Sequence, residues 1–195
     1  MHGLINRSIQ HFLRATYGTD LWQAVAEAVG APVSGFEALL QYDDALTLAM
    51  LDEAAARLDK PAEALLEDLG AFLVTLEPLR RLLRFGGVDY AEFLLSLEEL
   101  PARAHMALPD LEMPRITITK ASATDGRLTL AVQGRVPGWG LVLAGLLRSM
   151  ADDYGALALI EILPLGACRD HIAVDLLDTT FASGRRFELA RPVAS

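Results

Sequence analysis

The chain has 195 residues, a net charge of −9 and a single cysteine. The charge and the cysteine count each exclude a class of protein. Nucleic-acid affinity depends on Lys and Arg side chains that neutralise phosphates, so a chain this acidic does not predict a nucleic-acid partner. Cys168 alone cannot form an internal disulfide or a thiolate zinc cluster, and it fits a reducing compartment. We therefore expect a cytoplasmic protein.

The sequence is unusually apolar, with 52% hydrophobic residues and a mean hydropathy of +0.30. Its best apolar run, Leu141 to Leu147, falls short of the roughly 20 residues that a membrane span needs. The first residues lack the pattern of a secretion signal, so we expect the mature chain to start at Met1. These features predict a domain without a membrane span that encloses either a large core or an apolar cavity.

Apolar residues recur at helical spacing through the first hundred residues. The spacing and its Gly and Pro breaks predict helices over residues 5–13, 21–29, 43–58, 61–73, 79–85 and 88–97. Arg80, Arg81 and Arg84 on the fifth helix predict a solvated basic face or, alternatively, a docking patch for an acidic partner. Pro101 then interrupts the pattern, and because the residue before a proline avoids the α region, we expect Leu100 to mark a joint between two helices.

From Pro114 onward the apolar period changes from helical to alternating. Ile116 and Ile118 alternate with threonines, and residues 128–132 alternate again beyond a turn at 124–126, which predicts an antiparallel hairpin. We expect a helix over 141–154 and further strands over 156–163, 172–177 and 186–190. This order predicts an α+β fold, with an N-terminal helical lobe (1–87) packed on a mostly antiparallel sheet lobe (88–195) that one helix crosses. Residues 1–195 should form a single domain.

Two stretches of the chain resemble one family. Glu92 to Ile116 is similar, without gaps, to the proximal helix and following strand of the H-NOX family, the heme nitric oxide/oxygen-binding (HNOB) domains of bacteria and of soluble guanylate cyclase. The opening Met1 to Trp22 resembles the N-terminus of that family, and the similarity extends over almost the whole chain. The resemblance implies a bacterial stand-alone sensor in which a heme would lie between the lobes, and no enzymatic activity.

The resemblance also shows where this sequence departs from the family. Family members bind the heme iron through a helix histidine and hold the propionates through a Tyr-x-Ser-x-Arg motif. The histidine position falls on Pro101, which has no lone pair to donate. The motif positions fall on Val132, Gly134 and Val136, whose side chains cannot hydrogen-bond a carboxylate. Pro114 lies where the family has a proline that presses on the macrocycle, so we expect the cavity wall to be kept while canonical heme ligation is lost.

The resemblance predicts a pocket with nine lining residues: Ile5, Leu97, Leu100, Pro101, Pro114, Val132, Gly134, Val136 and Leu141. His105 is the alternative axial ligand because it lies one turn beyond Pro101, although that turn moves the imidazole about 5 Å along the helix axis. Arg135 is the alternative propionate contact. The other histidines lack the helical i, i+3 or i+4 spacing that favours a metal site.

Three functions remain open. The first is a sensor or regulatory protein without canonical heme, whose pocket is filled by its own side chains or takes another apolar ligand. The second is a heme sensor of nitric oxide that uses His105. The third is an unrecognised enzyme, although no nucleophile has a recognisable base and adjacent acids such as Asp152 and Asp153 point apart on a helix, which favours solvation.

For either sensor, the resemblance implies an output by contact with a partner acting in trans, either a histidine kinase or a diguanylate cyclase. Rotation between the lobes, pivoting near Leu100 and Pro101, would carry the signal. A diatomic gas would be a ligand only if heme were bound. Leu141 stands where oxygen-binding members place a distal tyrosine, so a bound heme would then favour nitric oxide over oxygen.

Overall fold

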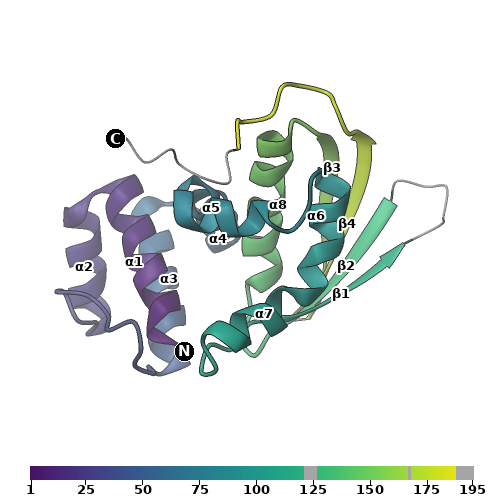
Figure 1. Ribbon diagram of the computed structural model, residues 1–195. Coiled ribbons are helices and arrows are strands. Elements are labelled where there is room, and N and C mark those ends of the chain that lie inside the picture. Colours follow the sequence, from purple (N-terminus) through teal and green to yellow (C-terminus); the bar gives the residue numbers. More distant parts are fainter. Residues whose placement is uncertain (121–126, 167, 188–195) are drawn as a thin grey trace, which may run out of the picture.

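The computed structural model describes residues 1–120, 127–166 and 168–187 and confirms the α+β fold (Figure 1). The elements follow in chain order: α1 (Gly3–Tyr17), α2 (Thr19–Val29), α3 (Asp44–Leu58), α4 (Ala62–Thr75), α5 (Glu77–Arg84), α6 (Tyr90–Ser96), the 3₁₀ turn η1 (Leu97–Glu99), α7 (Leu100–Ala107), β1 (Arg115–Lys120), β2 (Arg127–Gln133), α8 (Trp139–Tyr154), β3 (Leu157–Gly166) and β4 (Arg169–Asp178). Helices therefore come first, and α8 is the one helix that interrupts the strands.

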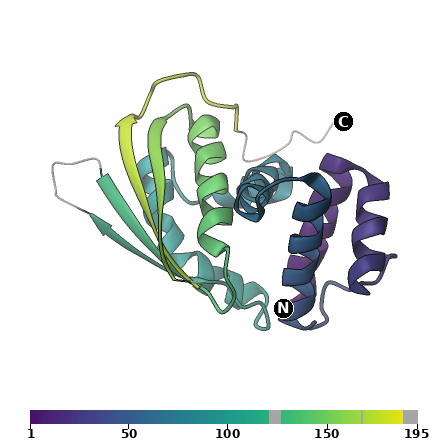
Figure 2. The same cartoon turned by 180° about the vertical axis from the view of Figure 1, so that it is seen from behind.

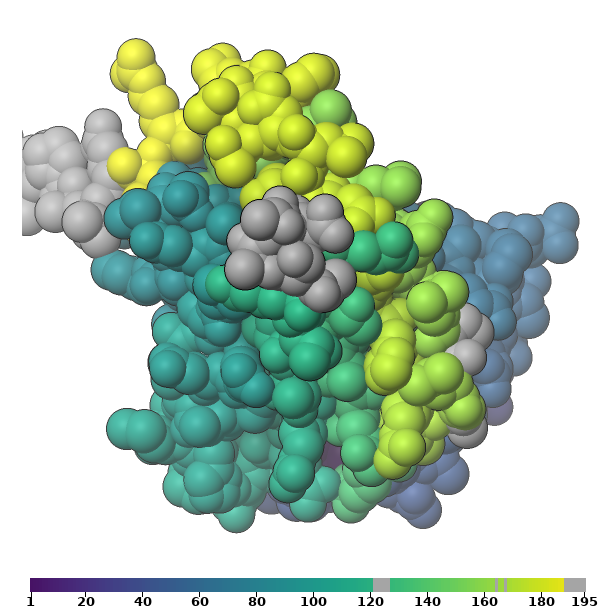
Figure 3. Space-filling view, turned by 90° about the vertical axis from the view of Figure 1, so that its right-hand side faces the viewer, coloured from purple at the N-terminus to yellow at the C-terminus, as the bar shows by residue number. Residues whose placement is uncertain are grey.

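The four strands form one antiparallel sheet in the order β1-β2-β4-β3. Leu130 pairs with Ile118 on one side and Ile172 on the other, so their side chains share one face. Helices α6 and α8 cover that face (Figures 1 and 2), while the opposite face is left open at the surface (Figure 3). The predicted hairpin of β1 and β2 is confirmed, and its expected turn at 124–126 lies outside the described residues.

Buried apolar side chains form two clusters, one in the helical half and one against the sheet. The helical half buries Phe12, Trp22 and Met50 among residues 9–69, and the sheet half buries residues from Val74 to Val174. The change of cluster falls within α4, where Leu69 belongs to the first and Val74 to the second. The division at residue 87 stays a prediction.

Helices α4 and α8 bring the two halves together at two glycines. A Cβ atom on Gly70 would lie 1.9 Å from the Val142 carbonyl oxygen, and one on Gly145 would lie 1.9 Å from the Glu67 carbonyl oxygen. Such distances are shorter than any real contact, so only glycine permits the two backbones to approach this closely. The crossing of α4 and α8 is thus a tight junction between the halves.

The joint near Pro101 is present, but its position differs from the prediction. Leu100 has φ −56° and ψ −44°, which are helical values, and Pro101 lies in the first turn of α7. A proline in that turn removes an N–H that would have no helical partner. The interruption therefore precedes Leu100, at the tighter turn of η1.

Two further expectations were wrong in part. Arg80 and Asp153 are not solvated: Arg80 is 3% exposed and Asp153 is 1% exposed, and the Arg80 Nε lies 2.6 Å from the Asp153 Oδ1. A last strand over 186–190 does not start where expected, because Arg186 and Phe187 lie in an irregular segment; residues 188–190 lie outside the described ranges.

Candidate functional site

Two adjoining cavities lie where the helical half meets α7, the segment 109–114 and the start of α8. The first has a volume of about 420 Å³ and a mixed lining that includes His2, His105, Asp110 and Arg135. The second has a volume of about 210 Å³ and is lined almost entirely by apolar side chains. Five residues line both cavities and form the wall between them: Met1, Leu111, Met113, Val136 and Trp139.

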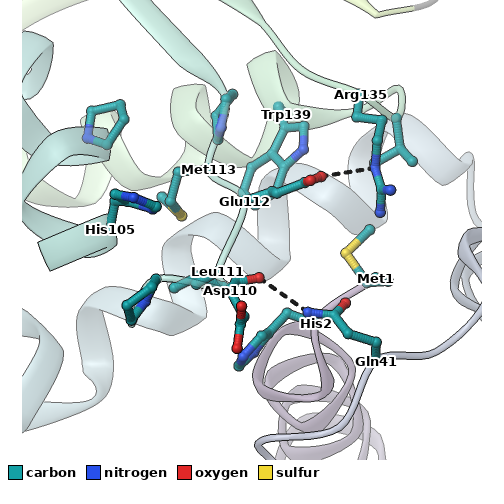
Figure 4. Close-up of a pocket in the computed structure, with 14 residues that line it drawn as sticks. Met1, His2, Gln41, His105, Asp110, Leu111, Glu112, Met113, Arg135 and Trp139 are labelled. Atoms are coloured by element: carbon teal, nitrogen blue, oxygen red, sulfur yellow. Dashed lines mark hydrogen bonds and ion pairs between the residues drawn. The ribbon is translucent and has the colours of Figure 1, made fainter. Parts of the chain in front are cut away.

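Polar contacts surround the larger cavity (Figure 4). The exposed Arg135 side chain holds two carboxylates, with its Nη2 2.8 Å from the Asp44 Oδ1 and its Nε 3.0 Å from the Glu112 Oε2. The Gln41 Nε2 donates to the Asp110 carbonyl oxygen over 3.0 Å. These contacts tie the helical half to the segment 109–114 and to the loop before α8.

Two histidines line the larger cavity from opposite sides, His2 at the start of α1 and His105 on α7 (Figure 4). The His2 Nδ1 accepts the Leu4 N–H over 3.2 Å, so this buried side chain caps the N-terminus of α1. His105 is exposed and has no hydrogen bond or ion pair within the described residues. Of the two histidines, only His105 therefore has no hydrogen-bond partner at either ring nitrogen within the described residues.

The smaller cavity is lined mainly by α1, α3, α4 and the start of α8. Its lining includes Ile5 and Ile9 of α1, Leu51 of α3 and Val142 of α8. Thr47 is one of its few polar residues, and its Oγ1 donates to the Asn6 Oδ1 over 2.7 Å. With its hydroxyl proton already donated, Thr47 leaves the cavity largely without hydrogen-bonding capacity, as suits an apolar occupant.

Some of the residues predicted for the pocket lie together at these cavities. Pro101, Pro114, His105 and Arg135 line the larger cavity, Ile5 lines the smaller one, and Val136 lines both. Pro101 is a tertiary amide without a ring lone pair that a metal can use. Leu97, Leu100, Val132, Gly134 and Leu141 line neither cavity.

Local structure explains why these five residues lie elsewhere. Leu97 and Val132 are each 1% exposed within the sheet-half cluster, and Leu100 packs against it. Strand β2 ends at Gln133, so the alternation that would place Gly134 and Val136 on the same face as Val132 stops there. A Cβ on Gly134 would lie 2.3 Å from the Trp139 Cδ1, which means that the indole occupies the space beside this glycine.

Sequence reasoning missed Trp139 and residues 109–113 of the cavity lining, although it predicted Pro114. Trp139 was part of a Pro-Gly-Trp-Gly turn and gave no sign that its indole would separate two cavities. The one available signal was helical spacing: Gly138 is the N-cap of α8, and Trp139 and Val142 lie three residues apart on one face of that helix. Leu141 belongs to the same helix but lines neither cavity.

The sequence comparisons identify the family to which this chain belongs. The Haem-NO-binding family profile matches residues 2–162, so the chain belongs to this family of heme-based nitric oxide and oxygen sensors. The chain is 24% identical over 160 residues to soluble guanylate cyclase 89Db of Drosophila melanogaster, covering 79% of this chain and 23% of that protein. It thus spans about a quarter of the length of that relative.

Solved H-NOX structures share the fold at low sequence identity. A Cs H-NOX variant with an unnatural amino acid superimposes with a TM-score of 0.79 at 16% identity, over 94% of this chain and 100% of that one. An unliganded iron(II) H-NOX variant from K. algicida gives a TM-score of 0.77 at 16% identity, over 91% and 97%. In the part of this chain that the structure describes, no helix has the length and apolar character to cross a membrane.

Proposed function

We propose that this protein is a cytoplasmic regulatory member of the H-NOX family that does not hold heme through the ligation usual for the family. The observation that supports the proposal most strongly is Pro101, which lines the interlobe cavity at the position that resembles the heme-ligating histidine. Its tertiary amide nitrogen cannot bind iron. The lone cysteine, which cannot form an internal disulfide, supports the cytoplasmic assignment.

The groups that would hold the heme propionates do not fit either. Val132, Gly134 and Val136 offer no side-chain donor, and Arg135 is already paired with Asp44 and Glu112. A propionate would have to replace two carboxylates around one guanidinium. The apolar cavity of about 210 Å³ lies below the roughly 300–1,000 Å³ of typical small-molecule sites, so it suits a small apolar ligand or none.

Output by contact is the second part of the proposal. The Drosophila relative is named a soluble guanylate cyclase, and this chain matches about a quarter of its length. We infer that this chain acts in trans on a histidine kinase or a diguanylate cyclase. The junction of the two halves near α7 supports this idea, since a ligand in either cavity would touch residues of both halves.

A heme sensor that uses His105 is the second candidate. One observation favours it: His105 lines the same cavity as Pro101, and its imidazole has no described partner. In that case His105 would supply the axial nitrogen, and the heme would supply the site for a diatomic gas. Leu141 lines neither cavity, so its position does not support the expected preference for nitric oxide over oxygen.

Heme titration distinguishes the two candidates. The purified protein is mixed with ferrous heme and its visible spectrum is followed, together with those of His105→Ala and Pro101→His. The first candidate predicts no stoichiometric Soret band in the wild type or in His105→Ala. It also predicts a gain of heme binding in Pro101→His, because the first turn of α7 tolerates histidine as well as proline.

A stoichiometric Soret band in the wild type that His105→Ala removes would overturn the first candidate and establish the second. A stoichiometric band that persists in His105→Ala would overturn both. Circular dichroism of each variant shows that a missing band does not come from an unfolded chain.

A further inference from the structure

A groove on α1, outside the interlobe cavities, combines basic side chains with a volume of about 730 Å³. One wall is α1 and the other is the segment 34–37, in the helical half that Figures 1 and 2 show remote from the sheet. The volume falls within the roughly 300–1,000 Å³ typical of small-molecule sites. The groove is therefore large enough for a metabolite.

Three basic side chains follow this groove along one face of α1. Arg7, His11 and Arg14 are spaced i, i+4 and i+7, which places them in a single row about 10 Å long. All three are exposed, and within the described residues none makes a hydrogen bond or an ion pair. Most other arginines differ, since Arg57, Arg80, Arg127, Arg135 and Arg148 each contact a carboxylate.

Gln10 adds a buried donor to the same groove. Its side chain belongs to a residue that is only 7% exposed, and its Oε1 accepts the Phe36 N–H over 3.3 Å. The Nε2 amide therefore remains without a partner in the described part of the chain. Gly35, with φ +120°, lets the turn lie directly against this amide, because a Cβ there would be 2.9 Å from Nε2.

The backbone N–H groups of residues 35–37 already have hydrogen-bond acceptors, so we expect mainly side chains to determine what the groove can bind. The Gly35 N–H donates to the Pro32 carbonyl oxygen over 2.9 Å, and the Glu37 N–H donates to the Tyr42 hydroxyl over 3.0 Å. Among the residues that the structure describes, Glu37 is the single carboxylate that lines the groove. Two guanidinium groups, an imidazole and an amide thus face one acid, in a chain whose net charge is −9.

We propose that this groove binds a small molecule that carries phosphate groups. Guanidinium groups match phosphate oxygens in charge and geometry, and two arginines about two turns apart suit two anionic groups in one molecule. The acidic remainder of the chain repels a long nucleic acid, whose phosphates extend beyond the row. The inference is independent of the proposed function: Leu4 and Ser8 line both the groove and the smaller cavity, but none of the side chains proposed to bind phosphate lines either interlobe cavity.

Binding of inorganic pyrophosphate and of adenosine diphosphate tests the proposal. Titrations followed by ¹H–¹⁵N chemical shifts at fixed ionic strength should show saturation, with the largest shifts at residues 7–14 and 34–37. Arg7→Gln or Arg14→Gln should weaken binding about tenfold or more, because each removes a charge-assisted hydrogen bond. Glu37→Gln should tighten binding, because it removes the one opposing charge.

Arg103→Gln is the matched control, since it removes the same charge from an exposed side chain of α7. Equal weakening in this control, or the absence of saturable binding of either probe, would overturn the proposal. Tighter binding of adenosine diphosphate would identify an organic phosphate as the ligand, whereas equal affinity would identify the free anion. None of these outcomes changes the result expected from the heme titration that tests the proposed function.

Discussion

Two ion-pair clusters, one at each end of α8, connect distant parts of the chain and differ in how far their side chains are buried. At the C-terminal end, Asp153 is 1% exposed and contacts Arg80 Nε at 2.6 Å and Arg84 Nη1 at 3.8 Å. Near the N-terminal end, Arg135 contacts Asp44 and Glu112, but the side chains are 56%, 27% and 67% exposed. One cluster is buried and the other lies in water beside the larger cavity.

The difference indicates which end of α8 can move. Breaking a buried pair leaves an uncompensated charge in a poor solvent, while an exposed pair exchanges its partner for water at little cost. Arg80 also donates to the Arg186 carbonyl oxygen over 3.1 Å, so the buried end fixes the C-terminal segment as well. The glycine contacts with α4 hold the helix itself, so at the cavity end of α8 we expect movement in the segment 109–114 and in the loop before the helix, with the Asp153 end as the fixed point.

Removal of the buried carboxylate should have the largest effect. Asp153→Ala removes the buried carboxylate beside Arg80 and leaves this buried guanidinium only the exposed Glu77 as an ion-pair partner, so we expect a loss of about 3–5 kcal/mol in the free energy of unfolding. Asp152→Asn is the control. Asp152 is the exposed neighbour of Asp153, so this substitution should change the free energy of unfolding by less than about 0.5 kcal/mol. Urea unfolding of the two variants measures both values, and similar losses in both would contradict the assignment of Asp153 as the fixed point.

The contrast between the two clusters also shows what the sequence could predict. Helical and alternating periods identified most elements, because these patterns report local geometry. Arg80 and Asp153 lie 73 positions apart, and nothing near either residue signals that they meet in the interior. The candidate site is a similar case: the family resemblance predicted Pro101 and helical spacing from Pro101 predicted His105, whereas the position of Trp139 beside Gly134 depends on how the chain leaves β2.

Tyr154 should make the buried end sensitive to high pH. Burial raises the pKa of Tyr154 to about 12, although the Arg84 guanidinium 3.8 Å from its ring centroid acts in the opposite direction. The folded state thus favours the neutral phenol, whose contribution to stability is complete below pH 10 and is lost as the pH rises through about 12. Its hydroxyl also donates to the Gly87 carbonyl oxygen over 2.9 Å.

Tyr154→Phe tests this dependence. Near pH 7 the variant should be about 1 kcal/mol less stable than the wild type, because one hydrogen bond is lost. Between pH 10 and 12 the difference in unfolding free energy should shrink, since only the wild type still has this phenol to ionise. Tyr90 is present in both proteins and cancels in the comparison. A difference that stays constant over this pH range would show that Tyr154 does not titrate as its burial implies.

Disruption of the exposed cluster should have the smallest effect on stability and the most specific effect on motion. Arg135→Gln removes contacts to Asp44 and Glu112, yet we expect a loss of no more than about 1 kcal/mol in urea unfolding, because water replaces both partners. Amide hydrogen exchange should meanwhile become faster in the segment 109–114, which Glu112 no longer ties to the loop before α8. A loss above about 2 kcal/mol, or unchanged exchange in this segment, would mean that the cavity end of α8 is held as firmly as the Asp153 end, and that movement between the halves needs a different hinge.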